Sequence, residues 1–319
     1  MPELPKISIC IPVFNTELYI GECAKSIFEQ QYQNLEIIFC DDCSTDNSLA
    51  IIHSVLKEYP KRCAQTYVIR NSTNSGPAIT RDNAYKRATG DYIWFIDSDD
   101  WIESNAVTFL VDKAIVDRAD ILYFDYEVNN QSDSKLCYGN HSFDAETTLL
   151  QKLKTSKDVA MWAIFIRKSF LSTLNIKIPT DFNVGEDYAV HIQILKGNPK
   201  ISYVSQLIYH YRRMSTSLSH RKSRMYFQEA IKMIYFIDSL LENDEQKKCF
   251  MTFKGSMKIQ VMESRLFLVR EVIGLFPEIR KECMHLDLPL SYRLALSFLG
   301  IGNYFIGKII LKIQKIIIS

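Results

Sequence analysis

The sequence lacks several features that identify common protein classes directly. No apolar run stays free of charges for the ~18 residues that a membrane-spanning helix needs. Neither the dinucleotide fingerprint G-x-G-x-x-G nor the phosphate loop G-x-x-x-x-G-K-[ST] is present, which argues against a dehydrogenase and a P-loop enzyme. The net charge of +1 gives no reason to expect nucleic-acid binding. With 47% hydrophobic and 24% charged residues, the 319 residues are typical of a globular protein with one large or two smaller domains.

The eight cysteines form no zinc-binding pattern. Cys40 and Cys43 have C-x-x-C spacing, but Asp41 and Asp42 stand between them and no second pair follows. We therefore expect most of the cysteines to be small buried hydrophobes in a reducing compartment. Residues 1–6 contain no signal-peptide apolar segment, which favours a cytoplasmic protein.

Apolar runs alternate with amphipathic segments over the first hundred residues. Each run predicts a buried strand, and each amphipathic segment predicts a helix. This βαβ alternation predicts an α/β protein with a mostly parallel central sheet and helices on both faces. The expected strands are Ile7–Val13, Leu35–Cys40, Tyr67–Arg70 and Tyr92–Ile96.

Carboxylates gather where two of these strands end. Asp41 and Asp42 follow the second strand, and Asp97, Asp99 and Asp100 follow the fourth. Because the carboxyl ends of parallel strands line one edge of a sheet, these groups are expected to meet in one crevice. Clustered carboxylates repel one another unless a cation neutralises them, so a divalent metal with a diphosphate is one interpretation. A solvated acidic turn is the other.

Five segments resemble, in order and spacing, the family 2 glycosyltransferases of the GT-A fold. The resemblance covers roughly residues 6–103, with further matches to about residue 217. It implies a Rossmann-like GT-A domain that moves a sugar from a nucleotide-sugar to an acceptor with inversion at the anomeric carbon. Enzymes of bacterial surface-polysaccharide synthesis are the group it resembles. The segments are Ile9–Asn15, Asp41–Asp46, Asn74–Arg81, Ala88–Tyr92 and Phe95–Asp100.

The resemblance implies roles for the residues at the strand ends. Asp42, with Asp41 beside it, would contact the base, most often uracil. Arg81 would approach the diphosphate, and Asn74 and Gly76 would belong to the same nucleotide-sugar site. Without the resemblance, Arg81 also suits a charge on the exposed surface of a helix. The residues expected to line the nucleoside pocket are Pro12, Phe14, Asn15 and Glu17. For Glu17 the alternative is an acid in the first turn of a helix, where the helix dipole stabilises it.

The Asp97-Ser98-Asp99 segment corresponds to the family's Asp-x-Asp motif. Asp99 would be the direct ligand of Mn²⁺ or Mg²⁺. Asp97 would lie nearer the ribose, or would contact the metal indirectly through the groups that bind it. Ser98, between them, would belong to the donor site. Two departures from the family pattern stand nearby. Cys43 replaces a glycine, and Asp82 replaces an asparagine and adds a negative charge near the diphosphate.

Glu186 and Asp187 follow Gly185 at the start of an expected helix. Capping is one role for them, because the helix dipole stabilises anions there. An inverting transfer needs a carboxylate that takes the proton of the acceptor hydroxyl. The resemblance to the family's Gly-Glu-Asp motif favours Asp187 as this base and Glu186 as its orienting partner. Their mutual repulsion is expected to raise one of the two pKa values.

The stretch that follows resembles the family's Tyr-x-Tyr-Arg segment. Lys200–Ser205 and Leu207–Arg212 are expected to be two short strands, after a strand at Met161–Ile166. Arg212 or its neighbour Arg213 would stabilise the departing diphosphate. His210 is either a further metal ligand or a structural residue.

We expect residues 1–220 to form the GT-A domain and residues 221–319 to form a helical region. Arg221–Leu241 and Asp244–Val272 are predicted to be long helices, and no acid follows Asp287. In the tail, isoleucines 306, 309, 310, 313 and 317 share one helical face, while Lys308, Lys312 and Lys315 lie on another. Such a helix suits the inner surface of the cytoplasmic membrane. Packing against the catalytic domain or a second subunit, as in a homodimer, is the alternative.

These observations favour a metal-dependent glycosyltransferase, a hexosyl- or N-acetylhexosaminyltransferase. It would take its sugar from a UDP-sugar and pass it to a saccharide or a lipid-linked saccharide. Nucleic acid is not an expected partner. A metal-dependent phosphatase or nucleotidyl transferase is one alternative, although the best-known phosphatase Asp-x-Asp follows a first strand rather than a fourth. A sugar-nucleotide-binding protein without transfer activity is the other.

Overall fold

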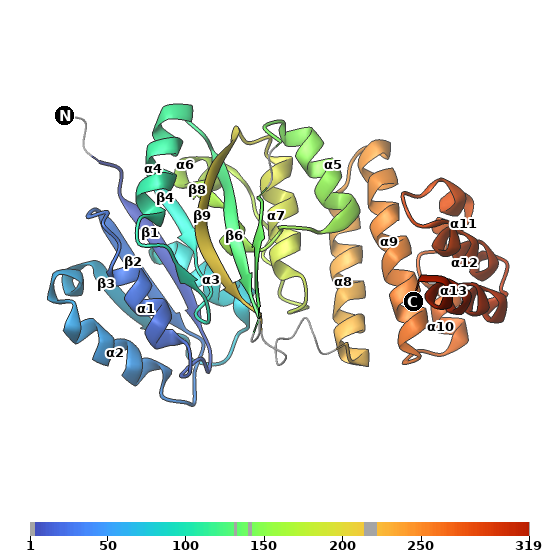
Figure 1. Ribbon diagram of the computed structural model, residues 1–319, viewed down its shortest axis with the longest axis horizontal. Helices are drawn as coiled ribbons and strands as arrows, with labels where there is room; N and C mark the ends of the chain where they lie inside the picture. Colours follow the sequence, from blue (N-terminus) through green and yellow to red (C-terminus); the bar gives the residue numbers. More distant parts are fainter. Residues whose placement is uncertain (1–3, 131–132, 140–141, 214–221, 319) are drawn as a thin grey trace. The chain divides into compact units, whose positions relative to one another are not determined.

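The computed structural model describes residues 4–130, 133–139, 142–213 and 222–318, with side chains described up to Ile313 (Figure 1). Its contacts divide the chain into two compact units. The first contains the residues up to Thr148 and those from Asp158 onward to the 214–221 stretch. The second contains Leu149–Lys157 and the C-terminal helices. The sequence did not anticipate that Leu149–Lys157 joins the second unit, and the predicted boundary at 220/221 lies outside the described residues.

One mixed sheet runs through the first unit. Its strand order is β3-β2-β1-β4-β8-β6-β9-β5, with β7 paired to β6. Strands β1, β2, β3, β4, β6 and β9 run in one direction and the others run against it, so the prediction of a mostly parallel sheet is confirmed. The strands are β1 (Ile7–Val13), β2 (Leu35–Asp41), β3 (Thr66–Arg70), β4 (Tyr92–Phe95), β5 (Trp101–Ile102), β6 (Ile121–Asn129), β7 (Ser134–Cys137), β8 (Phe165–Arg167) and β9 (Ile201–Arg212).

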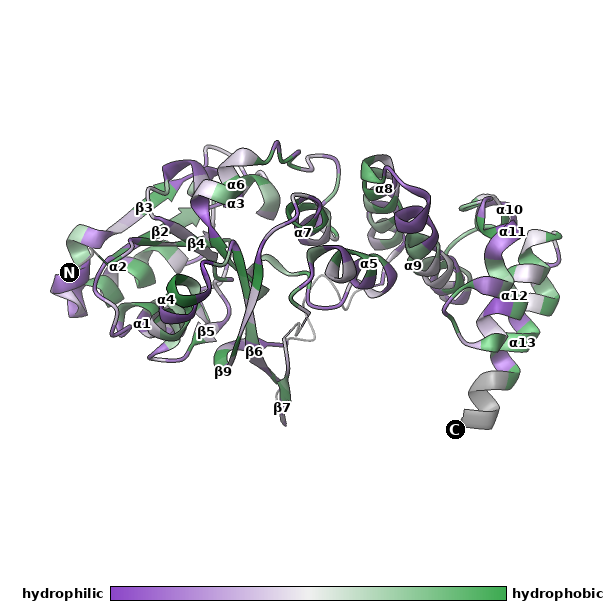
Figure 2. Cartoon of the chain, turned by 90° about the horizontal axis from the view of Figure 1, so that it is seen from above, coloured by the Kyte–Doolittle hydropathy of each residue, from purple (hydrophilic) through white to green (hydrophobic). Residues whose placement is uncertain are grey.

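Helices cover both faces of this sheet, as expected (Figure 2). On one face lie α1 (Ile20–Phe28), α2 (Ser48–Glu58) and α4 (Ala106–Asp117); on the other lie α3 (Pro77–Arg87), α6 (Lys168–Thr173) and α7 (Glu186–Lys196). Every residue of β2 is buried, which explains why its apolar residues are not restricted to alternate positions. Pro77 stands at the first helical position of α3, where its missing N–H costs nothing.

Three predicted elements differ from the structure. Met161–Ala163 is a short 3₁₀ helix, and only the end of the expected Met161–Ile166 strand pairs, as β8. The two strands expected within residues 200–212 are one strand, β9, whose pairing with β6 shifts register near Asp125. The helix expected over Asp244–Val272 breaks at Arg265, which adopts a left-handed conformation.

The second unit is helical. Its α9 (Asp244–Ser264) carries two buried lysines, each held by groups from neighbouring segments. Lys254 Nζ lies 2.7 Å from both Asp238 and Glu278, and Lys258 Nζ donates to the carbonyls of Ile273 and Leu275. Burial lowers the pKa of Lys258 to about 8. The other helices are α5 (Ala145–Thr155), most of which lies in this unit, α8 (Arg224–Leu240), α10 (Val269–Gly274), α11 (Ile279–Glu282), α12 (Leu290–Gly300) and α13 (Tyr304–Ile318).

A buried carboxylate joins three segments at the amino end of the sheet. Glu36 on β2 accepts hydrogen bonds from Ser8 Oγ at 2.6 Å, from Thr89 N at 2.6 Å and from Lys6 Nζ at 3.1 Å. Burial tends to raise the pKa of Glu36, but the hydrogen bonds from Ser8 and Thr89 outweigh it and lower the pKa below its usual value. The ionised form of Glu36 therefore stabilises the folded state.

We expect Glu36→Gln to lower the free energy of unfolding of the first unit by about 1–3 kcal/mol at pH 7, because it removes a charge that several donors hold. The ionised Glu36 of the wild type contributes its full stabilisation above the pKa of about 4.3 that it has in the unfolded chain. This stabilisation is lost as the pH falls through the lower pKa of the folded state. The difference in unfolding free energy between wild type and variant should therefore shrink in acid. Urea unfolding followed by tryptophan fluorescence measures it, since all three tryptophans lie in the first unit. Exposed Glu58→Gln is the control, and equal losses in both variants would contradict the prediction.

Candidate functional site

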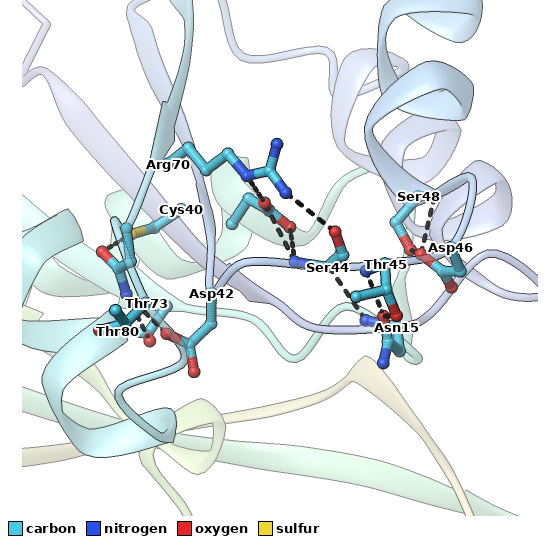
Figure 3. Close-up of polar contacts among 12 residues, drawn as sticks. Asn15, Cys40, Asp42, Ser44, Thr45, Asp46, Ser48, Arg70, Thr73 and Thr80 are labelled. Carbon is cyan, nitrogen blue, oxygen red and sulfur yellow. Dashed lines mark hydrogen bonds and ion pairs between the residues drawn. The ribbon is translucent and has the colours of Figure 1, made fainter.

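The loops after β1 and β2 are tied together by predicted site residues (Figure 3). Asn15 Oδ1 accepts from the backbone N–H of Thr45 at 2.9 Å, and the N–H of Asn15 donates to Ser44 Oγ. Glu17 Oε2 accepts from the backbone and side-chain N–H groups of Asn47. Both residues thus shape the rim of the crevice through contacts between loops.

Pro12 and Phe14 stand at the carboxyl end of β1. Pro12 pairs with Cys40 in the parallel register of β1 and β2. The Phe14 ring, just beyond the strand, is 45% exposed. An exposed aromatic face at this edge of the sheet is available for stacking on a base, which keeps the predicted role open.

Asp41 and Asp42 are both buried but have different partners. Asp41 pairs with Arg70 at 3.0 Å and accepts from the Ser44 N–H. Asp42 accepts from the N–H groups of Ser75 and Gly76, each at 2.8 Å, and so holds the loop before α3. Figure 3 shows this carboxylate reaching toward that loop.

Cys43 has a φ of 65°, a left-handed conformation that favours glycine. A cysteine in place of the family's glycine therefore strains the backbone at this position, but the turn still forms. Gly76 also has a positive φ, of 84°, and a Cβ there would lie 2.4 Å from Asn183 Oδ1. Only glycine fits at that position. Asn74, two residues earlier in the same loop, is exposed.

Arg81 is the centre of the site. One turn into α3, its guanidinium binds three carboxylates: Asp97 at 2.8 Å, Asp187 at 2.7 Å and Glu186 at 3.2 Å. The first follows β4, and the other two form the first turn of α7, whose predicted start at Glu186 is confirmed. Burial would lower the pKa of Arg81, but Asp187, Asp97 and Glu186 raise it above its ordinary value. Arg81 is therefore not a surface charge. The added charge of Asp82 is paired with Lys86 at 2.6 Å.

The turn after β4 is held from β9. Buried Asp100 accepts from Tyr209 Oη at 2.6 Å and from the Arg212 backbone N–H at 2.7 Å. The same Tyr209 oxygen accepts from the Asp97 N–H at 3.2 Å, and its ring stacks on Trp162 at 4.4 Å. Ser98 is buried within this turn. The sequence analysis assigned no role to Asp100 or Tyr209.

Two further residues of β9 contact the same region. The guanidinium of Arg212 donates to the Asp99 carbonyl at 2.9 Å, pairs with Glu22 and lies over the Trp101 ring. This places a cation beside the Asp-x-Asp motif, where the sequence expected one. His210 stacks on Trp101 at 4.9 Å.

Both ring nitrogens of His210 contact carboxylates, at 2.8 Å from Glu103 and at 3.2 Å from Glu127. These contacts support a structural role for this histidine, and its role as a metal ligand stays a prediction. Trp162 is likewise buried against Tyr209 rather than presented to solvent.

The acids of the crevice hold protons more tightly than usual. Burial, followed by the charge of Asp97, raises the pKa of Asp99 to about 6. Burial and Asp187 raise the pKa of Glu186 to about 7. Burial also raises the pKa of Asp187, although Arg81 opposes the shift, and Asp187 accepts from the Met161 N–H at 3.2 Å. A raised pKa suits a group that takes up a proton during a reaction.

The Asp97–Asp100 turn supplies some of the ligands that a divalent cation needs, but not a complete set. Among the described residues, no group of three His, Cys, Asp or Glu side chains is arranged to hold a metal alone. Mg²⁺ and Mn²⁺ sites that include a substrate diphosphate need only one or two protein carboxylates. The raised pKa of Asp99 marks a carboxylate whose charge is poorly compensated, and a cation there would relieve it.

Comparisons with known proteins agree with this architecture. The sequence profile described as "Glycosyl transferase family 2" matches residues 8–173, more than half of the chain. A glycosyltransferase of Haemophilus influenzae is 31% identical over 61% of this chain and 73% of its own length. The poly(ribitol-phosphate) beta-glucosyltransferase of Bacillus spizizenii is 31% identical over 65% of this chain. The chain spans only 32% of that relative and 31% of the Streptococcus pneumoniae glycosyltransferase GlyA.

Solved structures share the fold. Residues 1–349 of Staphylococcus aureus TarS, in complex with UDP-GlcNAc, superpose with a TM-score of 0.75 at 18% identity. The match covers 97% of this chain and 91% of that one. The Pyrobaculum calidifontis mannosyltransferase PcManGT, in complex with GDP-Man and Mn²⁺, has a TM-score of 0.54 at 16% identity. The expected GT-A fold is confirmed.

We expect Asp99→Asn to stabilise the metal-free first unit by about 1–2 kcal/mol at pH 7.5, because it removes a half-buried, repelled charge. A carboxyl whose folded pKa is raised destabilises the folded state fully above that value, about 6 here, and the penalty disappears toward the unfolded value of about 3.9. The gain should therefore fall away between pH 6 and pH 4. Urea unfolding in EDTA measures it, with exposed Asp112→Asn on α4 as the control. A loss of stability at pH 7.5 would show that the charge is compensated.

Proposed function

Because the chain belongs to glycosyl transferase family 2, we propose that it is a metal-dependent, inverting glycosyltransferase that uses a nucleoside-diphosphate sugar. The observation that carries this proposal is the Arg81 cluster, in which an Asp-x-Asp carboxylate and the Glu186–Asp187 pair share one guanidinium. It brings the expected donor site and the expected base within the reach of one side chain. The transferred sugar is a hexosyl or N-acetylhexosaminyl group and the nucleotide is UDP, in keeping with the UDP-GlcNAc complex of TarS.

The donor half of the proposal rests on the edge formed by β1, β2 and α3. The exposed Phe14 ring stacks on the base, and the loop held by Asp42 frames the nucleoside. Arg81 and Arg212 are the two cations beside the Asp97–Asp100 turn. They stabilise the negative charge that grows on the departing nucleoside diphosphate. Asn15 and Glu17 act on this site indirectly, through the loops they join.

The acceptor half rests on Asp187. Its carboxylate takes the proton of the acceptor hydroxyl as the oxygen attacks the anomeric carbon, while the carbon–oxygen bond to the diphosphate breaks on the opposite side. Glu186 keeps the pair oriented on Arg81. The Met161 N–H fixes the second oxygen of Asp187, so the base has one defined direction.

Asp99 would hold a Mn²⁺ or Mg²⁺ ion, with Asp97 beside it, and the bound ion would neutralise the diphosphate. Asp97 is paired with Arg81, which also binds Asp187, so it couples the position of the Asp97–Asp100 turn to that of the proposed base. A phosphatase using the same Asp-x-Asp is not favoured, because it leaves Glu186 and Asp187 without a role. A binding protein without transfer activity is not favoured either, since the base is intact and oriented.

We also propose that α13 lies on an anionic membrane surface, near a saccharide or lipid-linked acceptor. Among the described residues, no helix is long and apolar enough to cross a membrane. Tyr304 and Leu311 of α13 are buried, whereas Phe305 is 74%, Ile309 56% and Ile313 51% exposed. The sequence after Asp287 contains basic residues and no acid. An exposed apolar stripe flanked only by cations suits anionic lipid headgroups. Cytoplasmic location and dimerisation remain predictions.

The proposed reaction is tested by nucleoside-diphosphate release from UDP-, GDP- and dTDP-sugars with Mn²⁺ and a mixed saccharide acceptor pool. We expect turnover of one donor, lost in EDTA and lowered ~10³-fold or more by Asp187→Asn, because the acceptor proton then has no base. Calorimetry should find the donor still bound by Asp187→Asn with similar affinity. The control is Asp112→Asn on α4. Absence of nucleotide binding by the wild type would refute the proposal.

Membrane binding is tested by sedimentation with phosphatidylglycerol/phosphatidylcholine vesicles. We expect replacement of Phe305, Ile309 and Ile313 by serine to weaken binding ~10-fold or more, because their apolar surface no longer enters the interface. Replacing Met225 and Tyr235, exposed on α8, by serine is the matched control. Unchanged binding of the triple variant, or a dimer that it dissociates, would overturn the membrane assignment.

A further inference from the structure

A pocket of about 330 Å³ opens beside the proposed base, within the first unit. Its charged lining residues are Arg81, Asp82, Glu186 and Asp187, and most of the others are apolar. Three segments form the walls: one face of α3, the stretch Leu171–Ile178, and the first turns of α7. Cavities of this size, with apolar walls and a few convergent polar groups, are typical of small-molecule sites.

The local sequence explains the apolar wall. After α6 the chain is extended, and Leu174, Ile176 and Ile178 are half-buried while Asn175 and Lys177 are exposed. The three apolar residues line the pocket, and so does Asn175 between the first two of them.

The wall is held in place from α7. Gln193 Oε1 accepts from the Lys177 N–H at 2.8 Å, and Gln193 Nε2 donates to the Lys177 carbonyl at 3.0 Å. This two-way amide pairing fixes the extended segment against the helix. Val190, one turn after the proposed base, and Tyr85 on α3 complete the apolar lining.

One polar group at the end of the pocket lacks a partner. Arg81 Nε is buried and has no hydrogen-bond partner among the described residues, although the other guanidinium nitrogens bind carboxylates. Because this nitrogen is shielded from solvent, the polar end of the pocket offers a ligand the carboxylate oxygens of Glu186 and Asp187 instead. Carboxylate oxygens accept hydrogen bonds from hydroxyl groups, as an acceptor sugar requires.

We propose that this pocket binds the acceptor, and that it selects acceptors carrying an apolar group next to the sugar that is glycosylated. A fully hydroxylated saccharide would leave hydroxyls unpaired against Leu174, Ile176 and Ile178, each at a cost in affinity. An alkyl or aryl aglycone pays no such penalty and gains from the apolar wall. The inference rests on the proposed function and adds a substrate class to it.

The experiment compares methyl and butyl β-glycosides of glucose, N-acetylglucosamine and galactose as acceptors with the donor found above. We expect the butyl compound of the accepted sugar to have a KM ~10-fold or more below that of its methyl counterpart, because three more methylene groups are buried. Ile178→Trp, which fills the pocket, should reduce this ratio to about one. Val116→Trp, exposed on α4, should leave the ratio unchanged.

Equal KM values for the methyl and butyl acceptors in the wild type would overturn the proposal. It would also be overturned if Ile178→Trp kept the butyl preference and instead changed the preference between UDP-GlcNAc and UDP-glucose, since the pocket would then serve the donor. Calorimetry with the butyl glycosides alone separates this inference from the proposed function. Binding that Ile178→Trp abolishes, without turnover of any donor, would retain the pocket and refute the transferase. Donor turnover without any advantage of the butyl over the methyl glycoside would support the transferase and refute the proposed acceptor pocket.

Discussion

The pairing of Arg81 with three carboxylates is the interaction on which the site depends. Asp97 comes from the turn after β4, whereas Glu186 and Asp187 begin α7, about ninety residues further along the chain. Partly buried acids at this spacing would repel one another without a shared cation. The guanidinium therefore fixes the distance between the proposed donor site and the proposed base, and it links α3, β4 and α7 into one rigid unit.

The crevice concentrates charge at a cost to local stability. Burial raises the pKa values of Asp99, Asp100 and Glu186, so each of these carboxylates is less stable ionised than it would be in water. Tyr209 and the Arg212 backbone compensate Asp100 with two short hydrogen bonds. A site proposed to bind a cation and to accept a proton is expected to carry such strain. The remaining fold, with its apolar parallel strands, supplies the stability.

Several predicted site residues act through backbone geometry in the structure. Asp42 holds the amides of Ser75 and Gly76, and Asn15 and Glu17 join the loops after β1 and β2. These contacts determine the shape of the rim, so their loss would alter the proposed nucleoside site even without direct contact to a nucleotide. His210 on β9 likewise lies between Glu127 on β6 and Glu103, the residue after β5, and stacks on Trp101.

The sequence by itself determined the α/β class, the first four strands and the gathering of acids at one edge. These follow from local patterns: apolar runs of strand length, helix starts, and the rule that parallel strands end on the same side. Only the tertiary structure decided which side chains meet. The contacts of Arg81 with Glu186, of Tyr209 with Asp100 and of the Leu174–Ile178 wall with Gln193 join distant or irregular segments. No periodicity encodes such contacts, because they arise when whole elements pack against one another.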